Sequence, residues 1–359
     1  MRFLIIGQLP PPYTGQSLQI EKVTKILEKY EFRYRFIHLD FSENSREIGV
    51  LNISKVIKLI RIFFSICYNL IFFRPTCVYY PPAGPNRVPM YRDFILLFPI
   101  RLFKFKVFFR FHAGGISTMY DALSPVLKKI YEFSYFNVRY SSCMSEQGTD
   151  DPTFLKSKEI VIIPNGVKDN YNPAIQKGDK FYLLFVGACR ESKGILDFIE
   201  VARQAHSFNN IIVGRIIGDV VDTSIEQLIK AGQDEGYLVY EGTQSGQKLA
   251  GLFQSSSVLL FPTFYESENF PTVVIEAFSY FLPVISTRWR GVIDQIKPGK
   301  NGFIHDIHDI DGMLASAIGL FENKDLYDKM AVGARKDYEE QYTLERYERN
   351  FYNFFKMLN

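Results

Sequence analysis

Residues 259–278 read LLFPTFYESENFPTVVIEAF. An apolar strand ends at Pro262, a polar loop follows, and Pro271 opens a helix, since proline in a first helical turn loses no hydrogen bond. Strand–loop–helix units of this kind build parallel α/β sheets. Free amides at the helix start and the positive end of the helix dipole predict a site for an anion such as a diphosphate. These amides belong to Asn269, Phe270, Thr272 and Val273.

Two glutamates flank this helix start. Glu276 lies a little over one turn inside the helix, where its carboxylate can accept hydrogen bonds from vicinal hydroxyls such as those of ribose. Glu268 precedes the helix and is expected to point toward whatever lies beyond the phosphates. Two glutamates near a helix start are also a favourable dipole arrangement without further function, so the pair alone does not establish a site.

Strand-like and helical segments alternate on both sides of this stretch, first from residue 2 to 163 and again from residue 181. The polar residues 164–180 are typical of a linker. We therefore expect two Rossmann-like, doubly wound α/β domains, 1–168 and 169–342, facing across a cleft. Apolar residues at helical spacing in 343–359 predict a C-terminal helix that returns to the first domain.

The cysteines and the N-terminus indicate a cytoplasmic chain. Four cysteines lie far apart among 359 residues, with no spacing typical of a disulfide framework or a zinc site. The apolar run that follows Arg2 is too short for a signal peptide. We expect no export.

The first third of the chain is basic. Residues 1–110 hold 17 Lys or Arg and 7 Asp or Glu, or +10, whereas the whole chain carries only +3. The basic residues lie among Phe, Ile and Leu, without a nucleic-acid-binding motif. We therefore predict contact with a membrane surface, peripheral and at the inner face of the plasma membrane, and no nucleic acid.

The sequence leaves a second interpretation of this region open. The longest uncharged apolar run, residues 62–73, is shorter than the ~20 residues that span a bilayer. Lys55, Lys58 and Arg61 recur every three residues and would form one polar stripe on a helix. A buried crossover helix with a solvated stripe explains this pattern as well as a membrane-facing helix does.

Residues 259–278 resemble the motif of glycosyltransferase family 4, a family of retaining enzymes with the GT-B architecture. Its E-x7-E motif is matched by Glu268 and Glu276, with Ala277 following. Weaker matches extend the resemblance over nearly the whole chain, and their order and spacing are specific. They are the loop from Gly7 to Gly15, His112 after a strand, IPNGV, VGACRESKG, IIGD, EGT, PVIST and NGF.

The resemblance implies roles for the charged residues. Glu276 would hold the ribose of the donor, and Glu268 would contact the donor sugar near the reacting carbon. Lys193 matches the family's lysine, which neutralises the leaving diphosphate. The accompanying arginine of the family falls at Ala188, and Arg190 is the nearest substitute, although a surface charge is nearly as good an explanation for it.

The resemblance also reaches three residues of the first domain and two departures from the family pattern. His112 would act at a strand end, although a lone histidine is usually structural. The loop of Gly15 and Gln16 would lie against the donor phosphates and the acceptor. Asn269 replaces a frequent glycine and alters how the backbone meets the sugar, and Phe281 replaces another glycine and changes packing only.

The resemblance implies a retaining glycosyltransferase that moves a sugar from a nucleotide sugar to a saccharide or lipid-linked saccharide, as in bacterial surface-polysaccharide assembly. We expect no cofactor and no metal, because the only Asp-x-Asp, Asp309 to Asp311, lies past the last predicted core turn. A catalytically impaired scaffold subunit that binds sugar nucleotides is the alternative, motivated by Ala188. A nucleotide-dependent oxidoreductase is disfavoured because the first loop lacks G-x-G-x-x-G.

Overall fold

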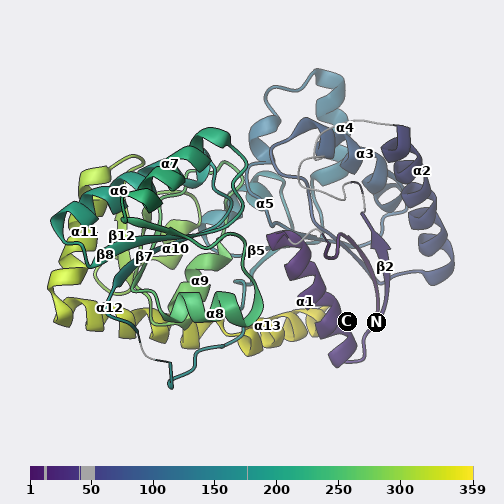
Figure 1. The fold of residues 1–359 in the computed structure, drawn as a ribbon. Helices are drawn as coiled ribbons and strands as arrows, with labels where there is room; N and C mark the ends of the chain where they lie inside the picture. Colours follow the sequence, from purple (N-terminus) through teal and green to yellow (C-terminus); the bar gives the residue numbers. More distant parts are fainter. Residues whose placement is uncertain (12–13, 40, 42–52, 176, 359) are drawn as a thin grey trace. The chain divides into compact units, whose positions relative to one another are not determined.

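The computed structural model describes residues 1–11, 14–39, 41, 53–175 and 177–358 (Figure 1). The chain divides into two compact units, Met1–Asn165 with Tyr347–Asn359, and Gly166–Arg346. Each unit is built on a six-stranded sheet whose paired strands are all parallel. The predicted doubly wound α/β class is confirmed.

The sheet of the first unit has the strand order β2-β1-β3-β4-β5-β6. Its strands are β1 (Arg2–Gly7), β2 (Arg33–His38), β3 (Cys77–Tyr80), β4 (Val107–Arg110), β5 (Tyr140–Cys143) and β6 (Glu159–Ile162). Its longer helices are α1 (Gly15–Lys29), α2 (Ile53–Tyr68), α3 (Arg87–Leu102), α4 (Pro125–Tyr135) and the C-terminal α13 (Leu344–Met357), with a short α5 (Asp150–Phe154).

Alternate residues of each strand face opposite sides of this sheet, and different helices cover the two sides. Leu4, Val78 and Phe109 pack in one core cluster with buried residues of α2, α3 and α4. Phe3 and Phe108 point the other way and meet Phe355 and Phe354 of α13, with ring centroids 4.9 and 4.5 Å apart. The sheet therefore lies between α2, α3 and α4 on one side and α13 on the other.

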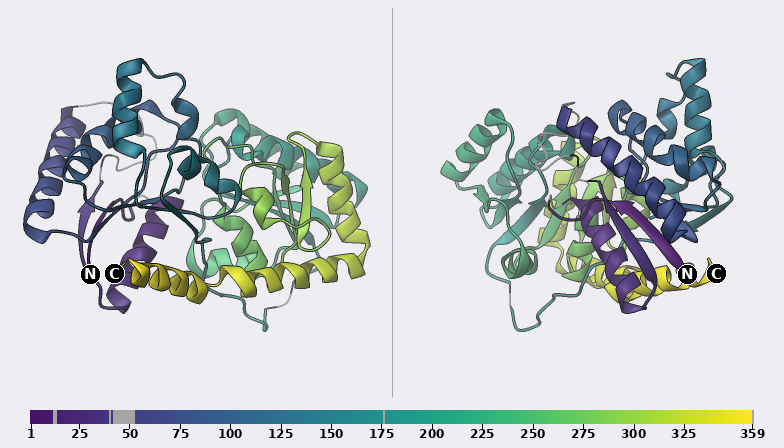
Figure 2. Two further views of the ribbon diagram at one scale, coloured as in Figure 1. Left: turned by 180° about the vertical axis from the view of Figure 1, so that it is seen from behind. Right: turned by 90° about the vertical axis from the view of Figure 1, so that its right-hand side faces the viewer.

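The C-terminal helix docks on the first unit, as predicted. Tyr352 of α13 stacks on Tyr30, with ring centroids 4.2 Å apart, and Glu348 forms an ion pair of 2.5 Å with Lys29 at the end of α1. Figure 2 shows this helix in yellow ending beside α1 in purple. The first unit is thus made of two stretches from opposite ends of the chain.

The helix α2 continues into a π-helical turn, Asn69–Phe73. Among the helices of the described residues, the combined segment Ile53–Phe73 is long and apolar enough to cross a membrane, judged by length and composition, and 28% of its apolar window is buried. The helix exceeds the uncharged run 62–73 because it also includes three basic residues. Ile62, Ile66 and Leu70 bury its inner side in the core, as in a crossover helix between two strands.

The sheet of the second unit has the order β12-β11-β10-β7-β8-β9, which read from its other edge is the 3-2-1-4-5-6 order of a Rossmann sheet. Its strands are β7 (Phe181–Val186), β8 (Ile212–Ile217), β9 (Leu238–Tyr240), β10 (Val258–Phe261), β11 (Val284–Thr287) and β12 (Gly302–His305). Its helices are α6 (Ile195–Phe208), α7 (Thr223–Asp234), α8 (Gly246–Gln254), α9 (Thr272–Ser279), α10 (Val292–Gln295), α11 (Ile310–Glu322) and α12 (Lys324–Asp337).

Candidate active site

The order of strands in the second unit reverses between β7 and β10. Ligands of open α/β sheets bind at such a switch point, in the crevice beyond the carboxyl ends of the strands. Lys193 lies in the loop that leaves β7, and Glu268 lies in the loop that leaves β10. Both loops therefore start at the place where a ligand site is expected.

Lys193 and Glu268, 75 residues apart in the sequence, form an ion pair. Their side chains are 20% and 13% exposed, so the pair is mostly shielded yet accessible at one side. The ammonium of Lys193 also lies 4.7 Å from the ring centroid of Tyr265, in a cation–π contact. The structure thus brings together the two residues that the sequence predicted to act on the sugar and the diphosphate.

Close packing holds the two loops together. Gly194 has φ +79°, a left-handed conformation that favours glycine, and a Cβ there would lie 2.1 Å from the carbonyl oxygen of Pro262. The backbone N–H of Phe264 donates to the carbonyl of Ser192 at 2.9 Å. Because glycine has no side chain, the loop with Lys193 can approach the loop with Glu268 closely at position 194.

The helix α9 begins without a side-chain cap. Pro271 occupies the N-cap position, one residue before the first helical residue, and its side chain accepts no hydrogen bond. The four first N–H groups of a helix need partners from outside the helix. Thr272 and Val273, predicted as anion-binding residues, form this first turn and are half-buried.

Asn269 and Phe270 precede the helix and are both buried. The amide Nδ2 of Asn269 is buried and has no hydrogen-bond partner among the residues that the structure describes. The ring of Phe270 packs 5.9 Å from Tyr342, so this side chain belongs to the core. Glu276 is half-buried on the second turn of α9. Of the predicted set, Asn269 offers an unpaired donor beside Glu268.

A third loop, which leaves β11, joins this cluster. The indole Nε1–H of Trp289 donates to the carbonyl of Tyr265 at 2.8 Å, and Thr287 donates to the carbonyl of Thr263. The following residue, Arg290, was missed by the sequence analysis. The sequence Arg288-Trp289-Arg290 directly after a predicted strand was the feature that could have drawn attention to it.

Arg190, the predicted substitute for the family's arginine, is exposed on the loop after β7. It caps a single turn of 3₁₀ helix, Glu191–Lys193, through its backbone. Ala188 is half-buried on the same loop. A role for Arg190 at the diphosphate stays a prediction.

His112, Gly15 and Gln16 belong to the first unit. His112 follows β4, as expected, and its Nε2 lies 3.1 Å from the hydroxyl of Tyr79. Burial, and secondly the charge of Arg110, lower the pKa of His112 well below its ordinary value, so the imidazole is neutral at pH 7. A neutral imidazole can donate from one nitrogen and accept at the other.

Gly15 is the first residue of α1, and Gln16 follows it half-buried. The preceding Thr14 caps the helix through a reciprocal pair of hydrogen bonds with Ser17. A Cβ added to Gly15 would meet no atom within 4 Å among the described residues. Local packing therefore gives no reason for a glycine at this position.

Within the described ranges, no group of three or more His, Cys, Asp or Glu side chains is placed to hold a metal ion. The Asp-x-Asp of the sequence has a structural use, because Asp309 caps α11 by accepting from the N–H of Gly312 at 3.0 Å. Its carboxylate also lies 3.2 Å from Nδ1 of His305. Asp311 is exposed in the first turn of α11.

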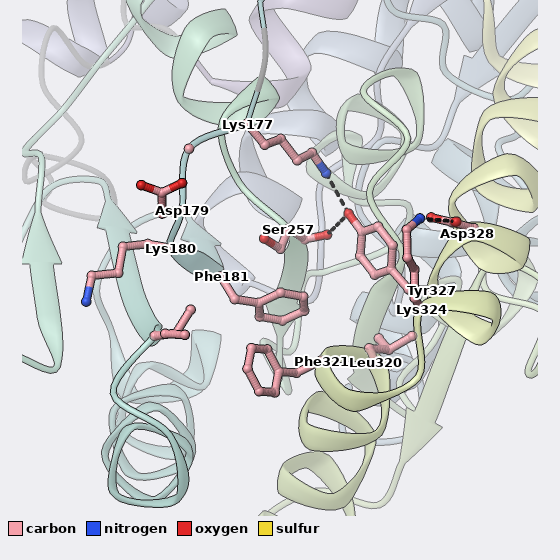
Figure 3. Close-up of a pocket in the computed structure, with 12 residues that line it drawn as sticks. Lys177, Asp179, Lys180, Phe181, Ser257, Leu320, Phe321, Lys324, Tyr327 and Asp328 are labelled. Atoms are coloured by element: carbon pink, nitrogen blue, oxygen red, sulfur yellow. Dashed lines mark hydrogen bonds and ion pairs between the residues drawn. The ribbon is translucent and has the colours of Figure 1, made fainter.

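A cavity of about 370 Å³ lies at the amino-terminal ends of the strands of the same sheet, where β7 begins (Figure 3). Phe181 and Phe321 form part of its lining. Its lysines have partners: Lys177 donates to Tyr327, Lys180 donates to the carbonyl of Asn210, and Lys324 pairs with Asp328. Because these charges are satisfied within the protein, we assign no ligand to this cavity.

Several solved structures superpose on nearly the whole length of this chain. Sucrose-phosphate synthase from Thermosynechococcus elongatus superposes with a TM-score of 0.76 at 13% identity, covering 100% of this chain and 99% of that one. Anabaena HepE in complex with UDP and glucose has a TM-score of 0.71 at 12% identity, covering 99% of both chains. At these identities the likeness shows the fold, which is GT-B-like.

Sequence comparison relates the second unit to a known family. Residues 167–337 match the family described as Glycosyl transferases group 1. This match covers 171 of the 359 residues, so it shows that the second unit is similar to a glycosyltransferase family. The matched region lies in the second unit and contains Lys193, Glu268 and Glu276.

Individual relatives are distant. An uncharacterized glycosyltransferase of Methanocaldococcus jannaschii is 24% identical over 63% of this chain and 68% of its own length. N-acetyl-alpha-D-glucosaminyl L-malate synthase of Bacillus anthracis is 30% identical over 36% and 34%. UDP-Gal:alpha-D-GlcNAc-diphosphoundecaprenol alpha-1,3-galactosyltransferase of Escherichia coli is 25% identical over 48% and 47%. The chain thus spans less than half the length of the last two.

Proposed function

We propose that this chain transfers a sugar, with retention of configuration, from a nucleotide sugar to a saccharide or lipid-linked saccharide acceptor in bacterial surface-polysaccharide assembly. The observation that carries the proposal is the Lys193–Glu268 ion pair at the switch point, beside the buried and unpartnered Nδ2 of Asn269. A positive group for the diphosphate, a carboxylate for the sugar and a spare amide donor are the parts that this transfer needs.

The proposed reaction breaks the bond between the anomeric carbon and the diphosphate oxygen and forms a bond from that carbon to the acceptor oxygen. Lys193 offsets the charge that builds on the leaving diphosphate, and a diphosphate oxygen takes the proton of the acceptor hydroxyl. Glu268 faces the donor sugar, and Glu276 holds the ribose. No metal ion or cofactor takes part. Activity lost on chelation and restored by Mg²⁺ contradicts this.

Three residues of the first unit are part of this proposal: His112, which follows β4, and Gly15 and Gln16, which begin α1. His112, neutral at pH 7, donates or accepts one hydrogen bond at the sugar without adding charge. For Gly15 and Gln16 we propose the role that the resemblance implies, contact with the donor phosphates and the acceptor, and no described atom lies within 4 Å of a Cβ placed at Gly15.

Nucleotide binding tests the proposal first. We expect a nucleoside-diphosphate sugar from a panel of UDP and GDP sugars to raise the melting temperature of the protein, because a ligand that binds only the folded state stabilises it. Glu276→Ala should lose this stabilisation, and Glu266→Ala, which changes an exposed residue of the same loop region, should keep it. Differential scanning fluorimetry measures both.

The transferase and the scaffold subunit differ in the fate of the bound donor. A transferase releases free nucleoside diphosphate from its donor, whereas a scaffold subunit is stabilised by the donor and releases none. If no nucleotide sugar stabilises the protein, both hypotheses lose their support.

The lipid-linked acceptor is proposed from the surface of the first unit. α2 and its continuation carry an outward apolar stripe that is exposed at every position: Ile53, Ile57, Ile60, Phe64, Tyr68 and Ile71. The neighbouring α3 and α4 carry shorter stripes of the same kind: Tyr91, Ile95, Phe98 and Leu102 on α3, and Val126, Ile130 and Phe133 on α4. These thirteen residues form three rows at helical spacing.

The charge of the part of this surface that α2 and α3 form is complementary to anionic lipid. Residues 53–110 contain ten Lys or Arg and one acidic residue, Asp93. Asp93 is fully buried and accepts hydrogen bonds from Tyr80, Tyr135 and Arg92. An apolar surface with basic residues and no exposed carboxylate in this stretch is typical of a protein that lies on an anionic membrane. We therefore propose a peripheral position at the cytoplasmic face.

Vesicle binding tests this position. We expect the protein to sediment with vesicles of phosphatidylglycerol and phosphatidylcholine and to detach as salt is raised. Phe64→Ser with Phe72→Ser should weaken binding by more than about tenfold, since burial of each exposed ring is worth roughly 1.5–3 kcal/mol. Val332→Ser, on the exposed side of α12, is the control. Equal binding of both variants, or self-association in place of vesicle binding, contradicts the proposal.

A further inference from the structure

Arg290 has an unusual backbone for an arginine. Its φ is +38°, in the left-handed region that side chains other than glycine rarely adopt. In the described part of the chain, eight non-glycine residues have positive φ, and six of them directly follow the end of a helix, where this conformation is ordinary. These six are Glu31, Arg74, Lys104, Asn137, Lys156 and Phe281. Arg290 and His308 instead follow strands β11 and β12.

Contacts within the protein account for His308 and leave Arg290 unexplained. Nδ1 of His308 lies 3.0 Å from both carboxylate oxygens of Asp197. No carboxylate of the described residues forms an ion pair with Arg290, and its Nε is buried without a hydrogen-bond partner. The charged carbon of its side chain lies 5.7 Å from the ring centroid of Trp289. A strained backbone that carries an incompletely satisfied cation is typical of a functional position.

The position of Arg290 links it to the donor site. Its neighbour Trp289 donates to the carbonyl of Tyr265, and the ring of Tyr265 lies 4.7 Å from the ammonium of Lys193. The loop of Arg290 is therefore fastened to the loop that carries Glu268. β11 pairs with β10 in parallel, so both loops leave the sheet at the carboxyl ends of its strands.

The donor site lacks a positive charge that its ligand needs. By the resemblance to glycosyltransferase family 4, Ala188 stands at the position of the family's arginine, and in this structure the charge of Lys193 is balanced by Glu268. The ion pair as a whole is neutral, whereas a nucleoside diphosphate brings at least two negative charges. Arg190 is exposed, but Arg290 is partly buried and holds an Nε–H that no group of the described residues accepts.

We propose that Arg290 binds the diphosphate of the donor and replaces the arginine that is missing at Ala188. This inference rests on the proposed function of the same site. A guanidinium can donate two parallel hydrogen bonds to phosphate oxygens, which gives both charge and geometry. The left-handed backbone holds the side chain in place at a cost to stability, because glycine would adopt the same conformation without strain.

Arg290→Gly separates binding from stability, because it should change them in opposite directions. The melting temperature of the ligand-free protein should stay equal or rise, since glycine relieves the positive φ. The affinity for a nucleoside diphosphate should fall by about 10–100-fold, the size expected for the loss of a hydrogen bond to a charged group. The affinity for the corresponding nucleoside monophosphate should change less than about threefold. Arg290→Lys should recover part of the affinity.

Fluorescence of Trp289, the single tryptophan of the chain and the neighbour of Arg290, reports the titrations, with calorimetry as a second readout. Arg288→Ala is the matched control, because Arg288 lies two residues away, is exposed and pairs with Asp306. Unchanged diphosphate affinity in Arg290→Gly overturns the inference while Glu276→Ala still tests the proposed function. A parallel loss of stability and of both affinities also overturns it, because it indicates a structural role. A wild type that binds no diphosphate overturns both.

Discussion

Glu268→Gln is expected to reduce sugar transfer by about 10²–10³-fold, the size of effect seen when one preorganised electrostatic group is removed from an active site. The glutamine keeps the shape of the side chain and removes the charge. Positive charge develops at the anomeric carbon as a glycosidic bond breaks, and a carboxylate beside that carbon stabilises it. Release of nucleoside diphosphate and formation of product, followed by chromatography, measure the loss.

The effect should be on the chemical step. Glu268→Gln should bind the donor nucleotide within about threefold of the wild type, because Lys193 then faces the diphosphate without a competing carboxylate. Glu266→Gln, an exposed residue two positions away, should transfer sugar at the wild-type rate. Full activity in Glu268→Gln would show that the carboxylate only holds Lys193 in place.

Phe355→Ala is expected to destabilise the first unit by about 3–5 kcal/mol, the usual cost of replacing a fully buried phenylalanine. Phe355 is fully buried, with its ring centroid 4.9 Å from Phe3 and 5.9 Å from Phe32. Lys356→Ala, on the exposed side of the same helix, should cost less than about 0.5 kcal/mol. Urea unfolding of both variants measures the difference.

Two probes resolve the units in this experiment. The single tryptophan, Trp289, lies in the second unit and reports only its unfolding, whereas circular dichroism reports both units. With Phe355→Ala, part of the dichroism transition should move to lower urea while the fluorescence transition stays. A fluorescence transition that moves equally would mean that both units unfold together, and an unmoved dichroism transition would mean that α13 contributes little.

Sequence patterns predicted most of the fold because it depends on local periodicity. The alternation of apolar strands and helices was enough for both parallel sheets, and the spacing of Tyr347, Phe351 and Phe354 was enough for the docking of α13. The resemblance named Lys193 and Glu268 separately, and the ion pair between them was not predicted, although both residues follow strands of the same sheet. Loops that leave adjacent parallel strands meet at one edge of a sheet, however far apart they are in the sequence.

Two kinds of feature could not be predicted from the sequence: which face of an apolar helix is buried, and where a residue other than glycine has a positive φ angle. The helix α2 is apolar on both sides, so periodicity alone cannot tell its inner row from its outer row. The strain at Arg290 arises from a φ angle that no local pattern specifies, in a residue type that normally avoids it. Pro271 lies one position earlier than expected because a proline suits the N-cap as well as the first turn.

The division of the first unit between two distant stretches of the chain has a consequence for protein synthesis. The whole of Gly166–Arg346 leaves the ribosome before Tyr347–Asn359 does, so the second unit can complete its core while the first still lacks α13. Until then Phe3 and Phe108 lack the ring contacts that Phe355 and Phe354 make with them. Residues translated late thus close the part of the protein that was translated first, and a ribosome that stops short of them releases a chain with one finished and one open unit.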